Sequence, residues 1–504
     1  MTESPDTQHL EAEHPVVARL SSSVSLGDGA RKGAAWLGSS KLILQVAQFG
    51  FSIINARLLF PSEFGIAALA LAIVAFGALF SNLGLAAAVV HAERATDELL
   101  NTVFWLNGGI SWLLAVLIAV AAWPVSQLYG DDALVVLMLI AALNFLFTRA
   151  PVQTALLERT FNFRTLAIVE TAATTTGLVV VPVAAVCGLG APSLILGPLC
   201  ETVILSVSLW LIVRWKPTGP PRRERVAALW AYSRGIFGFN VMTYWSRNLD
   251  TLALGGAVSN ASLGHYNRAF NLMMVPVQQV STVIGRVMFP SFARMRDDHA
   301  RVGAAWIKGM EFASALAMPT TVVFATTAPA LVAVLYGPRW AEMVPLLELL
   351  ALSAVPQVIS SSSGSVYRAL GRTGLLFKLG CISTALSVVA IALGIRWGAV
   401  GVAAALLIKS WVAFPIGIVP LMRILGVSFR DFVPAVLRVV GPVTAMAAVQ
   451  LAIRFSLPES MSPVVVLSAQ LAAGGIVYLG GLAAVRSPAY LAGRDRFLSR
   501  RKSG

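Results

Sequence analysis

The sequence predicts an all-α polytopic membrane protein with about 14 transmembrane helices. Apolar residues make up 57% of the 504 positions and charged residues only 12%, whereas a soluble chain carries about 25% charged residues. Long apolar runs recur along the whole chain, and each is long enough for the ~20 residues that cross a bilayer as a helix. The runs do not alternate between polar and apolar residues, which argues against a membrane β-barrel.

The fourteen expected spans follow one another at regular intervals, and their interior Gly and Pro are tolerated in membrane helices. They centre on residues 34–56, 64–90, 101–123, 134–156, 165–187, 192–213, 234–257, 265–289, 306–330, 342–363, 375–395, 399–422, 431–453 and 462–485. The first ~30 residues are polar and have no short apolar core after a basic start, so no signal peptide is expected there.

Basic residues predict the topology. Only four of the 38 Lys and Arg residues fall in odd-numbered connections: Arg57, Arg339, Arg396 and Arg454. Because cytoplasmic loops concentrate Lys and Arg, both termini are expected in the cytoplasm. The same rule explains the net charge of +14 without a nucleic-acid partner.

The stretch "RWKPTGPPRRER" (214–225) resembles a basic linker between two six-helix halves. The expected organisation is a disordered cytoplasmic tail (1–30), an N-lobe (31–214), the linker (215–230), a C-lobe (231–426), and two further helices with a basic tail (427–504).

A polar stripe runs along the first span. Its residues are spaced three and four apart and therefore share one helix face: Lys41, Gln45, Gln48, Ser52 and Asn55. Aligning Gly65 with Gly264 sets an offset of 199 between the halves, and this offset places four more polar residues on the seventh span: Asn240, Tyr244, Arg247 and Thr251. Two related helices are thus expected to turn polar faces toward a cavity.

Charged groups inside a membrane are costly and usually functional. We expect Asn267 and Asn271 on the eighth span to join the stripes as substrate-binding groups. Four acids are candidates for ion coupling or charge pairing: Asp250, Glu170, Glu201 and Glu311. Two blander alternatives stay open, since polar side chains often bridge membrane helices and Arg247 with Asp250 has the spacing of a local ion pair.

The sequence offers no sign of an enzyme. It has no P-loop, HExxH or nucleophile elbow in a fitting context, so no catalytic residue is predicted. Its three Cys and five His show no metal-ligand spacing, and neither a metal nor another cofactor is expected.

Several stretches carry a family resemblance over residues 30–425. They are "ARLLFPSEFGIAALALAIVAFGALFSNLGLAAAVV", "ALLERTFNFRTLAIVE", "YRALGRTGLLFK" and, most strongly, residues 247–298. In that last stretch the matching positions are Asp250, Gly264, Tyr266, Asn267, Pro276, Pro290, Asp297 and Asp298. The chain resembles the Wzx-type polysaccharide exporters, within the superfamily that also contains MATE drug transporters and lipid II flippases.

The resemblance implies two pseudo-symmetric six-helix lobes around a central cavity, with two extra C-terminal helices. It implies flipping of undecaprenyl-pyrophosphate-linked oligosaccharide across the bacterial inner membrane by alternating access. Lys41 and Arg247 fit the cationic groups that hold the anionic head, and Gln45, Gln48, Asn240 and Tyr244 fit the sugar-facing groups. Expected partners are this lipid-linked substrate, membrane lipid, H⁺ or Na⁺, and a polymerase and chain-length regulator of the same glycan system.

Two rival functions remain. A MATE-type drug antiporter would have a mainly acidic cavity, which the Lys41 and Arg247 stripe argues against. A membrane polymerase or glycosyltransferase would carry a large external loop, but the expected external loops, such as "GLGAP" and "SNASLG", are short.

Overall fold

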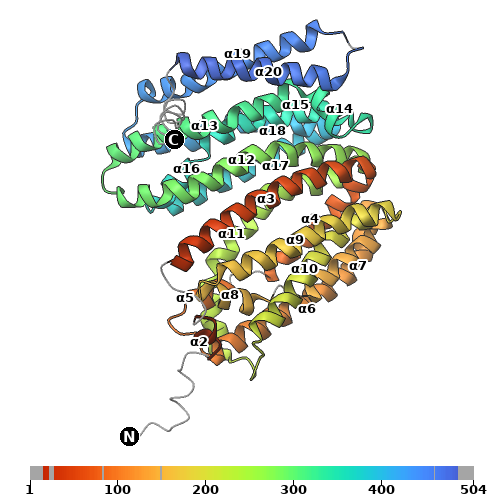
Figure 1. Ribbon diagram of the computed structural model, residues 1–504, viewed down its shortest axis with the longest axis vertical. Coiled ribbons are helices and arrows are strands. Elements are labelled where there is room, and N and C mark those ends of the chain that lie inside the picture. Colours follow the sequence, from red (N-terminus) through yellow and green to blue (C-terminus); the bar gives the residue numbers. More distant parts are fainter. Residues whose placement is uncertain (1–14, 22–27, 82–84, 148–149, 459, 486–504) are drawn as a thin grey trace, which may run out of the picture. The chain divides into compact units, whose positions relative to one another are not determined.

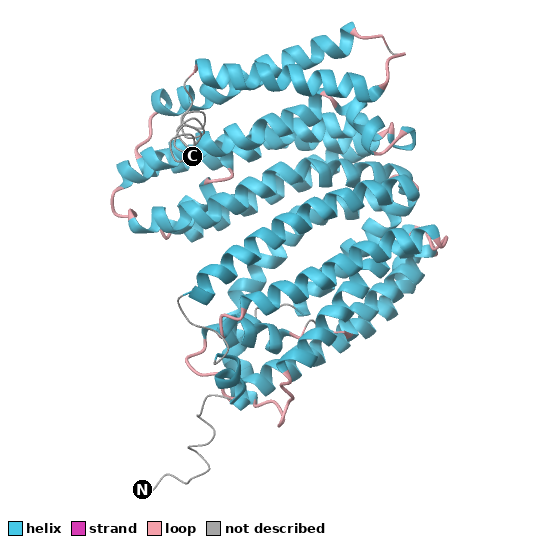
Figure 2. Ribbon diagram, in the orientation of Figure 1, coloured by secondary structure: helices cyan, strands magenta, loops and turns pink. Residues whose placement is uncertain are grey.

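A computed structural model describes residues 15–21, 28–81, 85–147, 150–458 and 460–485. Over these residues every regular element is a helix and none is a strand (Figure 2). The chain forms two compact units, Met1–Gly256 and Ala257–Gly504. The all-α prediction is therefore confirmed, and each unit is described in turn.

Unit 1 contains the helices α2 (Pro15–Ser21), α3 (Asp28–Leu58), α4 (Pro61–Ser81), α5 (Leu85–His91), α6 (Asp97–Tyr129), α7 (Ala133–Leu146), α8 (Pro151–Arg159), α9 (Phe163–Val186), α10 (Pro192–Val213) and α11 (Arg223–Gly255) (Figure 1). The long helix α6 shows why its ends lie where they do. Thr96 caps its first turn by accepting from the Leu99 N–H, and Gly130 ends it in a left-handed conformation with φ of 69°, which glycine adopts without strain.

Short helices α5 and α8 pack against each other within unit 1. Arg159, at the end of α8, donates to the backbone carbonyls of Val89 at 3.2 Å and Ala92 at 2.5 Å. These carbonyls lie at the C-terminal end of α5, where a helix leaves its last acceptors unpaired. The Arg159 guanidinium therefore fixes α8 against α5.

Unit 2 contains α12 (Asn260–Arg294), α13 (His299–Thr326), α14 (Ala328–Leu335), α15 (Met343–Ser360), α16 (Ser363–Ala369), α17 (Thr373–Gly394), α18 (Gly398–Leu425), α19 (Phe429–Ser456) and α20 (Pro463–Ala484), with 3₁₀ turns at Pro338–Trp340 and Ile395–Trp397. The last two helices, α19 and α20, lie side by side (Figure 1). They belong to this unit through buried contacts: Thr326 of α13 donates to Gln450 at 2.6 Å, and Gln470 of α20 donates to the Gln450 carbonyl at 2.9 Å.

A helix lies in each of the fourteen expected spans. By length and apolar composition, eight candidates among the described residues can cross a membrane, or ten if each of two bent pairs counts as one span. One of these candidates, Thr373–Leu425, is 53 residues long. It comprises the two helices α17 and α18, which pack against each other, and each has the ~20 residues that one of the expected spans needs. The total of fourteen stays a prediction.

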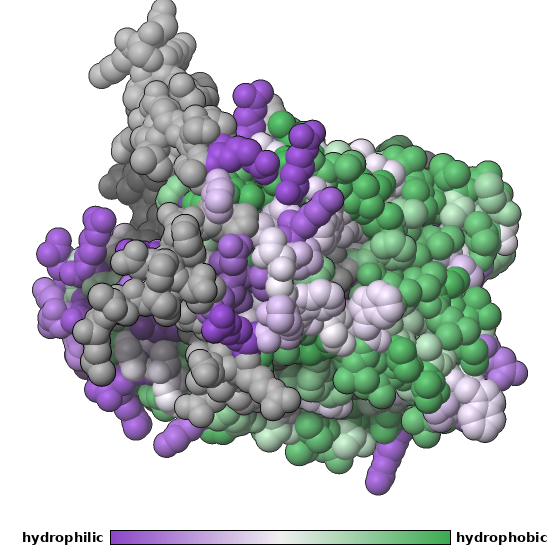
Figure 3. Space-filling view, turned by 90° about the horizontal axis from the view of Figure 1, so that it is seen from below, coloured by the Kyte–Doolittle hydropathy of each residue, from purple (hydrophilic) through white to green (hydrophobic). Residues whose placement is uncertain are grey.

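The helices α3, α11 and α12 carry the predicted polar stripes and the two asparagines. Elsewhere the surface is that of a multi-pass membrane protein: Figure 3 shows a broad apolar area, with hydrophilic residues gathered toward the left of the view.

The beginning of the predicted linker is a well-packed segment, residues 214–222, which we call the strap. Asn101 of α6 exchanges two hydrogen bonds with Thr218, at 3.1 and 2.9 Å. Trp215 is fully buried, and Arg222 forms an ion pair of 2.9 Å with Glu98. The strap leads directly into α11, which packs against α4, α5 and α6, so unit 1 includes α11. The predicted lobe boundaries stay a prediction.

Candidate functional site

The first stripe lies on α3, which packs against α9. Gln48 is exposed, Gln45 is half-buried and Asn55 is buried. The Asn55 side-chain oxygen has no hydrogen-bond partner. The side chain of Lys41 lies outside the described part of the chain. This face of α3 therefore presents amide groups with unused hydrogen-bonding capacity.

The second stripe lies on α11 and divides into an anchoring part and an exposed part. Tyr244 is buried, donates to the Ala72 carbonyl of α4 at 2.8 Å, and packs on the Phe76 ring. Asn240 is half-buried, whereas Arg247 is exposed. Tyr244 thus holds α11 against α4 in this structure, and its predicted contact with sugar stays a prediction.

Asp250 is buried, only 6% exposed, and its Oδ1 accepts from the Thr251 N–H at 2.8 Å. The described residues include no ion pair between Asp250 and Arg247. The two side chains have different surroundings, one in the protein interior and one at the surface.

In unit 2, Asn267 and Asn271 lie one turn apart on α12. Asn271 is exposed and donates to the Asn267 Oδ1 at 2.8 Å. The exposed Asn271 amide can meet a hydroxylated ligand.

Unit 1 encloses a cavity of about 470 Å³, which we call the polar chamber. Its polar lining comes from six helices: Ser81 of α4, Asn107 and Ser111 of α6, Asn144 of α7, Thr154 of α8, Glu170 of α9 and Thr202 of α10. Glu170 is half-buried, and the described residues offer it no hydrogen-bond or ion-pair partner. The carboxylate therefore faces space that water, a proton or a cation can occupy.

Asn107 is a member of this chamber that the sequence reasoning missed. Its amide nitrogen donates to the Ser81 carbonyl at 2.7 Å, which identifies the other side-chain atom as the oxygen. That Oδ1 is buried and has no partner. A buried acceptor left unpaired costs about 1–3 kcal/mol, so the chamber favours a guest that donates a hydrogen bond. The signal was present in the unusual run "WLNGGISW" (105–112).

Glu201 is held by a helix–helix contact. Its Oε1 accepts from Thr174 Oγ1 at 3.0 Å, between α10 and α9. These helices approach closely where a Cβ on Gly177 would lie 2.8 Å from the Gly197 carbonyl oxygen. Glu201 thus serves the packing of α9 on α10 in this structure.

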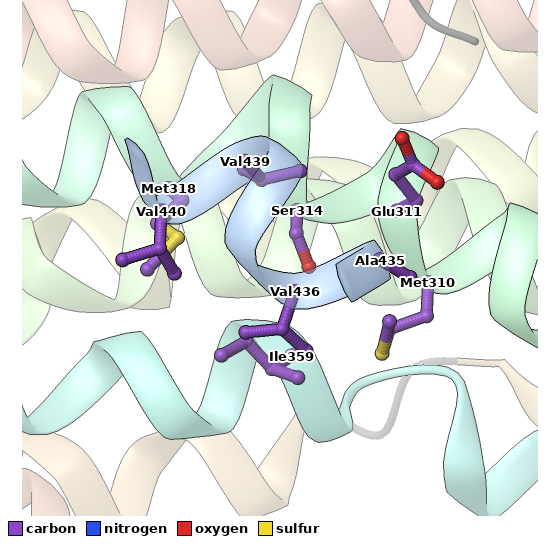
Figure 4. A pocket seen from close by; sticks show the side chains of 9 residues that line it. All are labelled: Met310, Glu311, Ser314, Met318, Ile359, Ala435, Val436, Val439 and Val440. Atoms are coloured by element: carbon purple, nitrogen blue, oxygen red, sulfur yellow. The ribbon is translucent and has the colours of Figure 1, made fainter. Parts of the chain in front are cut away.

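Glu311 of α13 is almost fully buried, 1% exposed, and forms an ion pair of 3.1 Å with Arg438 of α19. The surrounding gap has no room for a water molecule and is lined mainly by aliphatic and Met side chains from α13, α15 and α19 (Figure 4). Glu311 Oε1 and the Ser314 hydroxyl lack partners. Glu311 was predicted to serve in ion coupling or in charge pairing, and in the structure it is paired with Arg438. The sequence did not predict Arg438 as the partner.

Unit 1 thus contains a polar chamber with one carboxylate, and amide and Arg side chains along α3 and α11. Unit 2 separately contains the amide pair on α12. Among the residues that the structure describes, no group of three or more His, Cys, Asp or Glu side chains can hold a metal ion. The geometry is suited to binding hydroxylated or charged guests.

Solved structures define the class of protein. The structure titled "Lipid II flippase MurJ, inward closed conformation" superimposes with a TM-score of 0.70 at 15% identity, over 88% of this chain and 97% of that one. An inward-facing MATE multidrug transporter of the MOP superfamily superimposes with a TM-score of 0.54 at 16% identity. The superposition covers 83% of this chain and 97% of that one. The chain is a multi-pass membrane protein that shares its fold with these two structures.

Sequence relatives agree with this class. The chain is 25% identical to the "Lipopolysaccharide biosynthesis protein WzxC" of Escherichia coli K12, over 81% of this chain and 84% of the relative. It is 27% identical to the "Succinoglycan biosynthesis transport protein ExoT" of Rhizobium meliloti, over 79% and 83%. It is 23% identical to the "Teichuronic acid biosynthesis protein TuaB" of Bacillus subtilis, over 68% and 72%.

Residues 54–345 match the family described as polysaccharide biosynthesis proteins. This match spans more than half of the chain, and the chain belongs to that family. The predicted resemblance is confirmed. The names of these relatives and structures refer to transport, flipping and glycan biosynthesis rather than to a catalysed reaction.

Proposed function

We propose that this protein is a flippase, which moves undecaprenyl-pyrophosphate-linked oligosaccharide repeat units across the bacterial inner membrane by alternating access. The observation that carries the proposal is the family match over residues 54–345, together with relatives in glycan biosynthesis that align over most of both chains. The lipid II flippase supports it through its fold.

The physical task explains why this chain keeps polar helices. A sugar head has many hydroxyls, and each one left unsatisfied in hydrocarbon costs several kcal/mol, of order 4–8 on apolar transfer scales. A groove between two lobes supplies partners to the head while the polyprenyl tail stays in lipid, and rocking of the lobes alternates its access. The polar residues on α3, α11 and α12 are hydrogen-bonding groups of the kind that such a sugar head requires.

Within this proposal, Lys41 and Arg247 attract the pyrophosphate, and Gln45, Gln48 and Asn240 bind sugar hydroxyls. Arg247 supports this role through its exposed side chain. Asn267 and Asn271 contribute from α12. Both termini lie in the cytoplasm, as the distribution of Lys and Arg predicts.

For energy coupling we propose Glu170 as the ion-binding acid, since it lines the polar chamber. Asp250 is the second candidate. Glu201 and Glu311 are less suited to this role, since each is bonded to a neighbouring helix. If transport continues unchanged after both the proton and the sodium gradient are dissipated, ion coupling is wrong.

The direct test is complementation of a deletion strain. Loss of the protein should leave lipid-linked repeat units on the cytoplasmic face of the membrane, and wild-type protein should restore their export. Arg247→Ala should lower export by at least about tenfold at normal protein level, since one lost charge-assisted contact is worth about 1.5–3 kcal/mol. Arg372→Ala, at an exposed position between α16 and α17, is the control.

The test also separates the rivals. Repeat units that accumulate on the periplasmic side would indicate a polymerase or glycosyltransferase. Increased drug sensitivity of the deletion strain with normal glycan would indicate a MATE-type antiporter, which shares the fold. Either result would replace the flippase proposal.

A further inference from the structure

A second hollow in unit 1 lies beside the polar chamber, and we call it the aromatic groove. It holds about 670 Å³, within the range of about 300–1,000 Å³ typical of ligand sites. Its walls come from α6, α7, the start of α8 and α10: Phe104, Trp105, Trp112, Leu146, Phe147 and Trp210, with Asn107, Gly108, Gly109, Ala150, Pro151 and Ser206.

The groove arises from the spacing of two Trp and two Gly residues on α6. Each of the adjacent glycines Gly108 and Gly109 is three or four residues from both Trp105 and Trp112, so the four residues share one helix face. Trp105 and Trp112 are 49% and 63% exposed. The two glycines between them form a floor without side chains, so the indole rings become the walls of a channel.

Close helix packing does not explain these glycines. A Cβ at Gly108 or Gly109 would meet no atom within 4 Å. At Gly177 and Gly197, by contrast, a Cβ would collide with the facing helix. Each Gly costs a helix about 1 kcal/mol relative to Ala. Gly108 and Gly109 therefore keep open a space that no part of the described chain fills.

The strap contacts the walls of the groove. Trp105 donates to the Gly219 carbonyl at 3.0 Å, and the Phe104 ring contacts the Trp215 ring at 5.8 Å between centroids. Arg222 is paired with Glu98, but Arg214 and Lys216 are exposed. Two cations thus lie on the segment that contacts the groove walls.

We propose that the aromatic groove binds an anionic phospholipid of the bilayer, with one acyl chain lying over Gly108 and Gly109 and the phosphate at Arg214 and Lys216. Basic groups beside membrane helices attract anionic headgroups by about 1 kcal/mol each. Aromatic side chains are typical of the membrane–water interface. This site is distinct from the polar stripes, and the proposal does not depend on the flippase function.

The test uses photoreactive lipids with a diazirine in one acyl chain. Full-length protein is reconstituted with trace photoreactive phosphatidylglycerol or phosphatidylcholine, irradiated and mapped by peptide mass spectrometry. Adducts on the α6 and α10 groove peptides should be at least about fivefold more abundant with phosphatidylglycerol, since each basic residue contributes about that factor. Equal labelling by the two lipids would overturn the proposal.

Two sets of variants test where the acyl chain and the headgroup bind. Gly108→Leu should fill the groove and lower the adducts at these peptides at least about fivefold, because the Leu side chain occupies the space of the acyl chain. Its control is Gly475→Leu on α20, where a Cβ also meets no atom within 4 Å. Arg214→Glu with Lys216→Glu should abolish the preference for phosphatidylglycerol, while Arg372→Glu with Lys378→Glu, exposed basic residues of unit 2, should keep it.

A competition arm identifies the source of the lipid. Unlabelled phosphatidylglycerol should reduce the adducts, and unlabelled undecaprenyl pyrophosphate at equal concentration should not. If the polyprenyl lipid competes better, the groove holds the tail of a transported substrate and the phospholipid proposal fails. The unfolding temperature of each variant should equal that of the wild type. Altered labelling then reports a change at the groove rather than a loss of the fold.

Discussion

Glu170 in unit 1 and Glu311 in unit 2 are both carboxylates on helices expected to lie in the membrane, yet their surroundings differ. Glu170 opens on a chamber of about 470 Å³ whose lining combines hydroxyls and amides with apolar side chains. Glu311 is paired with Arg438 in a narrow gap lined mainly by aliphatic and Met side chains. A buried acid can thus bind a guest or join two helices, and the number of its existing partners separates the two roles.

The largest expected effect on stability comes from breaking the Glu311 pair. Glu311→Ala leaves Arg438 without its carboxylate, and loss of one partner of a buried ion pair costs about 3–5 kcal/mol. We expect about 3 kcal/mol, because the Arg438 side chain is 42% exposed. Unfolding of the purified protein in detergent, followed by intrinsic fluorescence, measures this loss.

Replacement of both Glu311 and Arg438 tests whether the loss of stability comes from the unpaired charge. Glu311→Met with Arg438→Met removes both charges, and an apolar pair of similar volume is often neutral or stabilising. The double variant should recover most of the stability lost by Glu311→Ala. If it stays as unstable as the single variant, the pair is not the reason for the loss.

Glu201 should give an intermediate result. Glu201→Ala removes the hydrogen bond from Thr174 that joins α9 to α10, and such bonds between membrane helices contribute about 0.6 kcal/mol, with a maximum near 1.7. A double-mutant cycle of Glu201→Ala with Thr174→Val measures the coupling free energy between the two side chains. A coupling energy near zero would mean that the two side chains contribute independently.

Glu170 should give the smallest effect on stability. Glu170→Gln keeps the shape of the side chain in an open chamber, and its free energy of unfolding should lie within about 0.5 kcal/mol of wild type. Under the coupling proposal, the same variant should lose the dependence of glycan export on the ion gradient. A stability loss as large as that of Glu311→Ala would contradict the contrast between the two acids.

Much of the fold followed from residue patterns. The low content of charged residues and the repeated apolar runs of helical length predicted an all-helical membrane protein, because the bilayer requires internally bonded backbone. The motifs between residues 247 and 298 predicted the family. The 3- and 4-residue spacing also predicted a polar face on α3 and another on α11.

The partners of individual polar side chains did not follow from such patterns. Spacing places Tyr244 and Arg247 on one stripe, but only packing shows that Tyr244 is buried against α4 while Arg247 is exposed. Arg438 and Glu311 are 127 positions apart in the chain, and no local periodicity relates residues at that distance. Likewise, the sequence "NGG" (107–109) by itself indicates only low helix propensity. The structure shows that its two glycines border an open space.

The residue order thus carries the class of the protein, its helices and its family, because hydrophobicity and short-range spacing are properties of the chain itself. Which acid is paired, which glycine borders a hollow and which part of a basic linker is packed depend on atoms brought together from distant helices. Close packing in the interior makes those outcomes specific. Glu170 and Glu311 look alike along the chain, and their surroundings in the folded protein distinguish them.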